Sequence, residues 1–561
     1  MHKKETKPDK KLLKLIPIAL IIILGWFVYA NSLKGGFIWD DDFLVKDNAY
    51  IKSWSHILKI FTEDIGAGAR SHYIFYRPLQ MITYMLDYSF WKLNVVGYHS
   101  TNILLHILVA LSIFRFIDII FKDRIISFLA GVFFIAHPMH TEVVSYISGR
   151  TDSLAFLFLL VCFILYIKQL RLDSLSRYIF MLLSYILALL SREASLILPA
   201  LLLVYHYVFN QKIKTKEFLS ILGLTFLYAL LRFTLLRGLL AGVTPADTTV
   251  FQRLPGVFAA ITNYITLLIS PFNLHMEYGY RQFNLAEPKV IIGIGIFVIS
   301  LIYAFKQRRA NKLISFSILW FFIGLSPVSD IYPVNAYMAE HWLYLPSLGF
   351  FLILAQAIVW LYKRKKIRII TIIFTCALLA FYSYLTVRQN NYWGKPITFY
   401  EMTLKFTPNS PRMLNNLGEA YDKIGRKEEA IMLYREAIKF DPRCAEAYNN
   451  IGTASVNMGK YIDAIVAYQQ AIAINPNYAE IHNNLAKTYL IIGKREDAIT
   501  VLKKAIEIDP SYAMSYYNLA AIYFNQQQYD LTIYYYDKAI ELGLAAEPAV
   551  SKLIESVRQK K

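Results

Sequence analysis

Long apolar runs recur through the first 390 residues, with short polar segments between them. The runs cover 15–30, 98–121, 125–141, 153–170, 178–198, 196–209, 218–236, 290–305, 313–329, 342–362 and 367–386. About 20 apolar residues in a helix cross the ~30 Å hydrocarbon core of a bilayer. The pattern therefore predicts an all-α membrane bundle of about eleven spans over residues 1–390. A further run at 258–270 breaks the alternation of sides, which favours a re-entrant or interfacial segment.

Basic residues collect at alternate ends of these runs. The clusters are Lys122 with Arg124; Lys168 with Arg171 and Arg177; Lys212 with Lys214 and Lys216; Lys306 with Arg308 and Arg309; and Lys363 through Lys366. Cytoplasmic loops of membrane proteins are enriched in Lys and Arg, so this side should be cytoplasmic, together with the lysine-rich start at Lys3, Lys4 and Lys7. An odd number of spans then places everything after Arg388 outside the cytoplasm.

Composition agrees with membrane residence and excludes other classes. The chain has 561 residues, is 56% hydrophobic and carries a net charge of +19, and its apolar share exceeds that of typical soluble domains. Its aromatic residues lie in apolar runs and repeat helices and not beside a basic face, which argues against nucleic-acid binding. Cys162, Cys376 and Cys444 lie in unrelated segments, so neither a zinc site nor a disulfide framework is indicated.

The C-terminal part repeats with a fixed period. Pro408, Pro442, Pro476 and Pro510 are each 34 residues apart, which is the tetratricopeptide interval. The sequence thus predicts a linker at 391–410, a superhelix of four repeats at 411–544 and a capping helix at 545–561. Such arrays commonly offer surfaces to protein partners.

One amide recurs in every repeat, at Asn416, Asn450, Asn484 and Asn518. An amide side chain both donates and accepts hydrogen bonds, so this ladder is a candidate site for the backbone of an acceptor peptide. Alternatively, the amides satisfy local backbone groups.

Three consecutive carboxylates, Asp40, Asp41 and Asp42, follow the first apolar run directly. Crowded carboxylates at a membrane surface repel each other and lose hydration, which raises a pKa toward that of a useful general base. A hydrated acidic loop is the alternative. If a divalent cation is used, these three side chains are its candidate ligands.

Polar motifs interrupt other apolar runs at the same predicted side. His137, His140 and Glu142 precede Arg150 and Asp152, and their spacing suits sugar binding or a hydrogen-bonded loop better than a helical zinc site. Arg192 and Glu193 interrupt a long apolar region, where ionisable groups usually mark a pathway or site. Arg192 either pairs with Glu193 for structural reasons or holds a lipid phosphate. The remaining candidates are Arg77, His99, Glu340, His341 and Tyr344.

At these residues the chain resembles the transmembrane and tetratricopeptide-repeat containing O-mannosyltransferases, of the GT-C glycosyltransferase class. The matching stretches are residues 37–41 (Phe-Ile-Trp-Asp-Asp), 76–79 (Tyr-Arg-Pro-Leu), 97–99 (Gly-Tyr-His), 137–142 (His-Pro-Met-His-Thr-Glu), 149–152 (Gly-Arg-Thr-Asp), 192–193 (Arg-Glu) and 339–347, where His341 replaces the expected Arg.

The resemblance implies a polyprenyl-phosphate sugar donor, usually mannose, and transfer to Ser or Thr hydroxyls of secreted or membrane proteins. Asp40 or Asp41 would be the general base. Arg192, with Arg77 or Arg150, would stabilise the departing phosphate, and direct displacement would invert the anomeric centre. No cofactor is certain, although some relatives use a divalent cation.

Two other functions compete with this one. A non-catalytic scaffold, anchored in the membrane and recruiting partners through its repeats, would not need the acidic loop. A transporter would show duplicated halves and polar residues at mid-bilayer, and neither is seen. Enrichment in Lys, Ile, Tyr and Asn favours a bacterial plasma membrane, and the endoplasmic reticulum is the alternative location.

Overall fold

The computed structural model describes residues 10–69, 75–234, 249–279, 281–329, 336–544 and 546–559, and these residues contain no β-strand. Lys3, Lys4 and Lys7 lie outside the described residues. The chain forms two units, Met1–Phe399 and Tyr400–Lys561. The boundary between them falls within the expected linker, part of which is helical as α17 (Pro396–Leu404).

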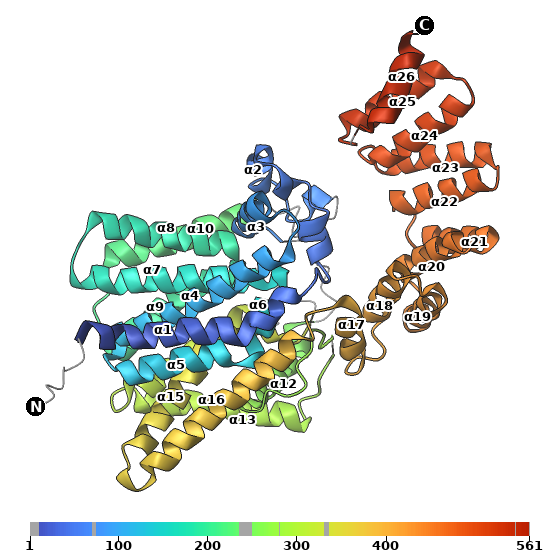
Figure 1. The fold of residues 1–561 in the computed structure, drawn as a ribbon. Helices are drawn as coiled ribbons and strands as arrows, with labels where there is room; N and C mark the ends of the chain where they lie inside the picture. The colour runs from blue at the N-terminus through green and yellow to red at the C-terminus, as the bar shows by residue number, and fades with distance from the viewer. Residues whose placement is uncertain are drawn as a thin grey trace, which may run out of the picture. The chain divides into compact units, whose positions relative to one another are not determined.

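Eleven helices of the first unit correspond to the eleven apolar runs (Figure 1). They are α1 (Lys10–Tyr29), α4 (Val95–Phe121), α5 (Arg124–Ala136), α7 (Arg150–Arg171), α8 (Leu175–Ser191), α9 (Leu198–Phe209), α10 (Thr215–Phe233), α13 (Pro288–Gln307), α14 (Lys312–Leu325), α15 (Ser347–Tyr362) and α16 (Arg368–Asn390). Helix α7 packs against α4 and α8. At the centre, Phe163 lies 5.0 Å from Phe116 and 6.1 Å from Trp320 between ring centroids.

Fewer helices than eleven have the length and apolarity of a full crossing. Among the described residues, five qualify, and a sixth does if α5 and the bent segment after it count as one span. Four more are apolar but shorter. The predicted eleven crossings are thus not confirmed. Helix α12 (Val250–Ile269), which contains the run predicted to be re-entrant, is not among these candidates.

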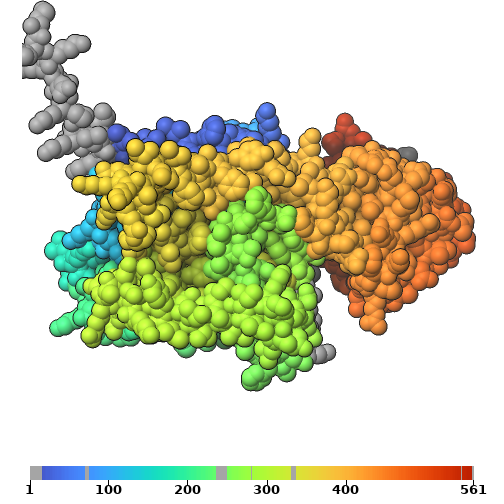
Figure 2. Space-filling model, turned by 90° about the horizontal axis from the view of Figure 1, so that it is seen from below, coloured from blue at the N-terminus to red at the C-terminus, as the bar shows by residue number. Residues whose placement is uncertain are grey.

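The surface of this unit suits lipid. Figure 2 shows a face to which α13 and α16 contribute. Large apolar side chains on both helices point outward, such as Ile299 (69% exposed) and Ile369 (72% exposed). A contiguous apolar surface of this kind is rare on soluble monomers and is expected where a protein contacts hydrocarbon.

Four of the five basic clusters meet at one end of the bundle. Arg171 donates to Ile119 O, Lys214 donates to Gln169 O, and Arg308 donates to Tyr207 O. These bonds join segments that are up to 101 residues apart in the chain. The sequence predicted that these clusters lie on the same side of the membrane, and in the fold four of them lie at the same end of the bundle.

The opposite end carries short elements between the long helices. They are η1 (Ala30–Lys34), the π-helical turn η2 (Asp42–Lys46), η3 (Tyr50–Lys52), η4 (Trp54–His56), α2 (Ile57–Ile60), η5 (Ala67–Ala69), α3 (Pro78–Trp91), η6 (Pro138–His140), α6 (Thr141–Ser145), η7 (Ile147–Gly149), η8 (Glu193–Ile197), η9 (Ser326–Val328) and η10 (Glu340–Leu343). Here Asn390 donates to Val28 O, which ties the end of α16 to the end of α1. Every predicted site residue of the first unit lies in one of these short elements, beside one, or in the first two turns of a helix that follows one.

The second unit is a series of antiparallel helix pairs. The pairs are α18 (Pro411–Lys423) with α19 (Lys427–Phe440), α20 (Ala445–Asn457) with α21 (Tyr461–Ile474), α22 (Ala479–Ile491) with α23 (Arg495–Ile508), and α24 (Ala513–Asn525) with α25 (Tyr529–Glu541), followed by α26 (Pro548–Gln559). Gly418 lets the pair close up, because a Cβ there would lie 2.6 Å from the Tyr434 ring. Gly425 between the helices has φ +84°, which glycine adopts without strain.

Candidate functional site

The acidic loop has an unusual backbone. Trp39 has φ 58°, a left-handed conformation that is strained for a bulky residue, and its ring packs edge-on against Phe399. The π-helical turn η2 follows directly. Strained residues and π-turns concentrate at functional sites, so the loop's geometry points to a site between Trp39 and Asp42.

Asp41 fastens this loop to the start of α7. Its Oδ1 accepts hydrogen bonds from Ser148 N–H at 2.9 Å and from Ser148 Oγ–H at 2.5 Å, and its Oδ2 accepts one from Ile38 N–H at 3.1 Å. The side chain is only 1% exposed. Asp41 therefore holds the loop in place, with both carboxylate oxygens occupied by internal donors.

The environment of Asp41 favours its protonated form. Burial raises the pKa of Asp41 from 3.8 to about 7, even though the hydrogen bonds from Ser148 and Ile38 oppose the shift, and the charge of Asp40 raises it further. The two neighbouring carboxylates are thus unequal, which is the condition for a division of roles between them.

This shift makes stability depend on pH. Since the folded state binds the Asp41 proton more tightly than the unfolded chain, the stabilisation is complete below pH 3.8 and is lost as the pH rises toward 7. We expect thermal unfolding in detergent to show a falling midpoint over that interval, and Asp41→Asn to flatten the slope. Asp42→Asn is the control, and it should keep the wild-type dependence of the midpoint on pH. If Asp41→Asn also kept that dependence, the raised pKa of Asp41 would be contradicted.

The other two aspartates are placed differently. Asp42 pairs with Lys46 at 3.4 Å on the surface, with 28% of the Asp42 side chain exposed. Asp40 is partly exposed and precedes the turn. Because Asp41 is enclosed and Asp42 lies in the turn, Asp40 is the carboxylate best presented to a substrate.

A cluster of opposite charges lies beside the start of α7. Asp152 forms an ion pair with Arg192, and the charges of Arg77, Glu142 and His341 also act on it. These groups come from four separate segments, and the tertiary fold brings them together. Arg192 does not lie inside a long helix as the apolar pattern suggested, because α8 ends at Ser191 and Arg192 is extended.

The second ion pair of the cluster is looser. Arg77 Nη2 lies 3.3 Å from Glu193 Oε1, and both side chains retain some exposure. Arg77 and Glu193, both partly exposed, and the buried Arg192 therefore lie together where α3 begins and α8 ends. Guanidinium groups in such a position can bind a phosphate in bidentate fashion.

Glu142 and Glu340 form a neighbouring carboxylate pair. Glu142 accepts from His341 Nδ1 at 2.6 Å and from His341 N–H at 3.0 Å. Glu340 accepts from His275 N–H at 2.6 Å and from Tyr278 OH at 2.7 Å. Burial and the charge of Glu142 raise the pKa of Glu340 well above its ordinary value. Glu340 thus favours its neutral form, and Glu142 is held by two donors of His341.

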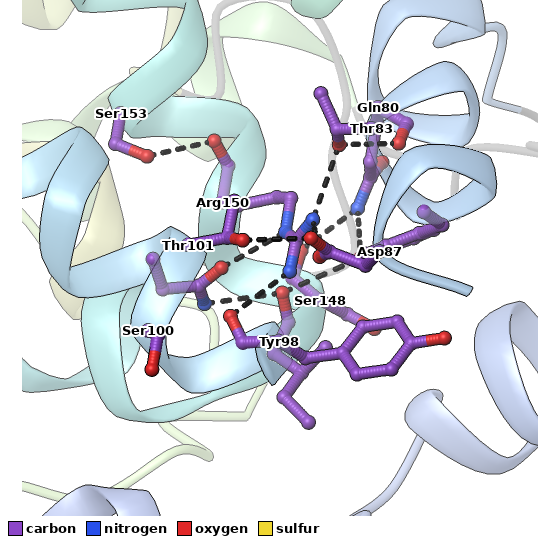
Figure 3. A network of polar contacts seen from close by, with 12 residues as sticks. Gln80, Thr83, Asp87, Tyr98, Ser100, Thr101, Ser148, Arg150 and Ser153 are labelled. Atoms are coloured by element: carbon purple, nitrogen blue, oxygen red, sulfur yellow. Dashed lines mark hydrogen bonds and ion pairs between the residues drawn. The ribbon is translucent and has the colours of Figure 1, made fainter. Parts of the chain in front are cut away.

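Arg150 is fully enclosed in a polar network (Figure 3). It donates to Asn102 Oδ1 at 2.9 Å, Asp87 Oδ2 at 2.6 Å and Tyr98 O at 3.1 Å, and its guanidinium stacks over Tyr84. With 0% exposure, this side chain has no open path to a lipid phosphate. Its geometry gives it a structural role, which is to hold α3 and α4 against the start of α7.

Three of the predicted histidines, His99, His137 and His140, are buried, and so is Tyr344. His140 bonds Phe134 O at 2.8 Å and Ser347 Oγ at 3.1 Å, and His137 bonds Leu268 O at 3.2 Å. Tyr344 OH lies 2.7 Å from His106 Nδ1, and His99 lies 3.3 Å from Gly35 O. These satisfied contacts fit the alternative of a hydrogen-bonded core, and the His140 ring packs 4.9 Å from that of Tyr344.

In the described part of the chain, no three His, Cys, Asp or Glu side chains are grouped so that they could hold a metal ion. The candidate cation ligands Asp40, Asp41 and Asp42 belong to the described residues and form no such group. Both carboxylate oxygens of Asp41 already accept hydrogen bonds from groups of the protein, and Asp42 pairs with Lys46. The donor set therefore does not fit a resident divalent cation.

Three of the repeat amides donate to the asparagine that precedes the ladder position in the previous repeat. Asn450, Asn484 and Asn518 each donate to an asparagine 35 residues earlier, at 3.1, 3.2 and 2.7 Å. Asn415 donates to Asn416. Asn450 and Asn484 also line a polar cavity of about 550 Å³. The ladder thus joins successive repeats and still borders open space.

Three groups at the site were not among the residues predicted from the sequence. Arg232, in the last turn of α10, acts on the charge of Glu193, and Tyr228 lies one turn before it. The signal for Arg232 was present, because it is an ionisable residue within a predicted apolar run. Ser148, the anchor of Asp41, carries no distinctive sequence signal.

The second unit is a tetratricopeptide-repeat array. Models described as TPR repeat or Tetratricopeptide repeat match residues 411–444, 452–493, 487–527 and 513–542. Among solved structures, the chain is similar to MamA, with 32% identity, a TM-score of 0.24 and coverage of 26% of this chain and 85% of that one.

Most of the chain has named relatives. It is 26% identical to protein O-mannosyl-transferase F38B6.6 of Caenorhabditis elegans, over 74% of this chain and 61% of that protein. It is 24% identical to TMTC3 of Mus musculus over 74% and 50%, and 36% identical to mouse TMTC2 over 26% and 18%. The chain spans about half the length of these relatives. It is thus a relative of the TMTC protein O-mannosyl-transferases, as its motifs predicted.

Proposed function

We propose that this protein transfers a sugar, most simply mannose, from a polyprenyl-phosphate donor to Ser or Thr hydroxyls of proteins on the non-cytoplasmic side of a membrane. The observation that carries the proposal is the anchoring of the acidic loop by Asp41 to Ser148. Four residues further, Asp152 pairs with Arg192. A base and guanidinium groups therefore meet at one end of the bundle, which is the pair of functions that this chemistry requires.

In this reaction Asp40 accepts the proton of the acceptor hydroxyl while the hydroxyl oxygen attacks the anomeric carbon. The bond between that carbon and the phosphate oxygen breaks, and the lipid phosphate leaves with one additional negative charge. Arginines at the ends of α3 and α8 stabilise that charge. Direct displacement inverts the anomeric centre and forms no covalent glycosyl-enzyme.

The remaining groups have supporting roles in the proposal. In the proposal Glu142, His341 and Glu340 bind sugar hydroxyls, since carboxyl and imidazole groups form hydrogen bonds with hydroxyls. The repeat cavity lined by Asn450 and Asn484 is placed to hold an extended acceptor segment. The end of the bundle with the basic clusters would face the cytoplasm.

The direct test is transfer by the purified full-length protein in detergent. We expect polyprenyl-phosphate mannose and a Ser/Thr-rich acceptor protein to yield a peptide heavier by one hexose in mass spectrometry, with the α- or β-linkage opposite to that of the donor. Retention of the donor configuration would contradict direct displacement. Complete lack of transfer to any outer-side protein, in vitro and in cells with and without the gene, would favour the scaffold.

A further inference from the structure

Four buried polar atoms that have no hydrogen-bond partner among the described residues gather where α3 begins and where α8 and α10 end. They are Arg77 Nε, Glu193 Oε2, Tyr228 OH and Arg232 Nη1. Buried polar atoms are nearly always paired, so each such atom calls for an explanation. Four of them around one place indicate that a polar ligand belongs there.

The groups that carry these atoms are neighbours. Arg77 and Arg232 both act electrostatically on Glu193 and on Tyr228, and Arg232 also acts on Tyr76. Helix α8 packs against both α3 and α10. The four atoms thus belong to one cluster, which joins residues more than 150 positions apart.

The charges of these groups favour an anionic ligand. Arg192 is already paired with Asp152, so Arg77 and Arg232 face the single carboxylate of Glu193. The four groups that carry the unpaired atoms, two guanidiniums, one carboxylate and one hydroxyl, therefore have one more positive than negative charge. A ligand with one negative charge and several acceptor oxygens would neutralise it and would accept hydrogen bonds from both guanidiniums and from the Tyr228 hydroxyl.

The surroundings favour a lipid as the carrier of that anion. Next to the cluster, the last turns of α10 expose Phe226 (70%) and Phe233 (63%), and Phe180 (61%) lies further along α8. A ligand entering from this side would leave a hydrocarbon chain along these helices and place its phosphate among the arginines.

We propose that Arg77, Arg232 and Tyr228 bind the phosphate of the lipid-linked sugar, and that Glu193 restricts the site to a phosphate with a single negative charge. This inference rests on the proposed function. The donor is a phosphodiester with one charge, whereas the lipid phosphate left after transfer is a monoester with up to two. Glu193 repels the second charge, which promotes release of the product.

Binding of polyprenyl phosphate to the full-length protein in detergent tests the inference without requiring turnover. Arg77→Met and Arg232→Met should each weaken binding at least about 10-fold, the loss of a charge-assisted hydrogen bond. Arg308→Met is the matched control, because Arg308 contacts Tyr207 at the basic end. Glu193→Gln should tighten binding of polyprenyl phosphate more than that of the polyprenyl-phosphate sugar.

Tyr228→Phe separates binding from folding. The hydroxyl has no partner, so its removal should leave the unfolding temperature unchanged or slightly higher, yet weaken phosphate binding about 10-fold. Wild-type affinity in both Tyr228→Phe and Arg232→Met would overturn the proposal. Equal affinity for polyprenol, which has no phosphate, would also overturn it.

Two further comparisons identify the ligand and separate this inference from the reaction. Inorganic phosphate competing as well as the lipid phosphate would overturn the lipid assignment, and a lipid phosphate that binds at least 10-fold tighter than phosphatidylglycerol supports it. Phosphate binding that follows these variants in a protein without transfer activity would contradict the reaction alone. Sugar transfer with unchanged binding in the variants would contradict the phosphate site alone.

Discussion

Asp40→Asn should lower the rate of sugar transfer by roughly 10²–10⁴-fold, which is the range that general-base catalysis contributes. The amide keeps the size of the side chain but cannot accept the proton of the hydroxyl. Initial rates with polyprenyl-phosphate mannose would measure the change. The KM for the donor should move little, because the base is needed only when the acceptor attacks.

Asp42→Asn is the matched control, because Asp42 lies two residues away and pairs with Lys46 at the surface. It should transfer within about twofold of the wild type, since surface ion pairs contribute little. The Asp40 assignment fails if the Asp40 variant keeps its rate, or if the rate depends on Asp42 instead.

Arg150→Met should destabilise the membrane unit by about 3–5 kcal/mol, because it leaves Asp87 as an uncompensated buried charge. The pair is closed, with the Arg150 side chain 0% and the Asp87 side chain 7% exposed at 2.6 Å. Thermal unfolding in detergent would show the loss, and the bonds from Arg150 to Asn102 and Tyr98 O disappear with it.

The comparison for this effect is Arg115→Met, since Arg115 pairs with Asp118 at 3.2 Å but is 56% exposed. That variant should lie within about 0.5 kcal/mol of the wild type. Replacing Arg150 and Asp87 together with Met should cost less than the sum of the single changes. Full additivity would show that the two side chains do not act as a pair.

Much of the fold could be read from local patterns. Each of the eleven apolar runs became a helix, because a continuous apolar stretch in a bilayer must satisfy its backbone internally. The 34-residue period located the repeats, since every repeat buries the same positions against its neighbours. The number of crossings could not be read in this way: α8 and α9 are short, and Arg192 lies in the break between them.

The candidate site was predictable only in part. Asp40, Asp41, Arg77 and Arg192 could be named, because charged residues beside apolar runs are costly unless they serve a purpose. The environments of these side chains could not be predicted from the sequence. Asp41 and Asp40 are adjacent in sequence, yet one is enclosed by Ser148 and Ile38 while the other is partly exposed. Arg150 and Arg192 have similar sequence settings, but only Arg150 is saturated by buried partners.

The sequence alone determined which segments are helical, which end of the bundle is basic and where the repeats begin, because hydrophobic period and charge placement act over a few turns of helix. The tertiary structure alone decided which carboxylate is enclosed and which arginines share a site. Arg77, Arg192 and Arg232 meet only after α3, α8 and α10 pack together. Burial and charge pairing depend on such distant neighbours, and no local pattern encodes them.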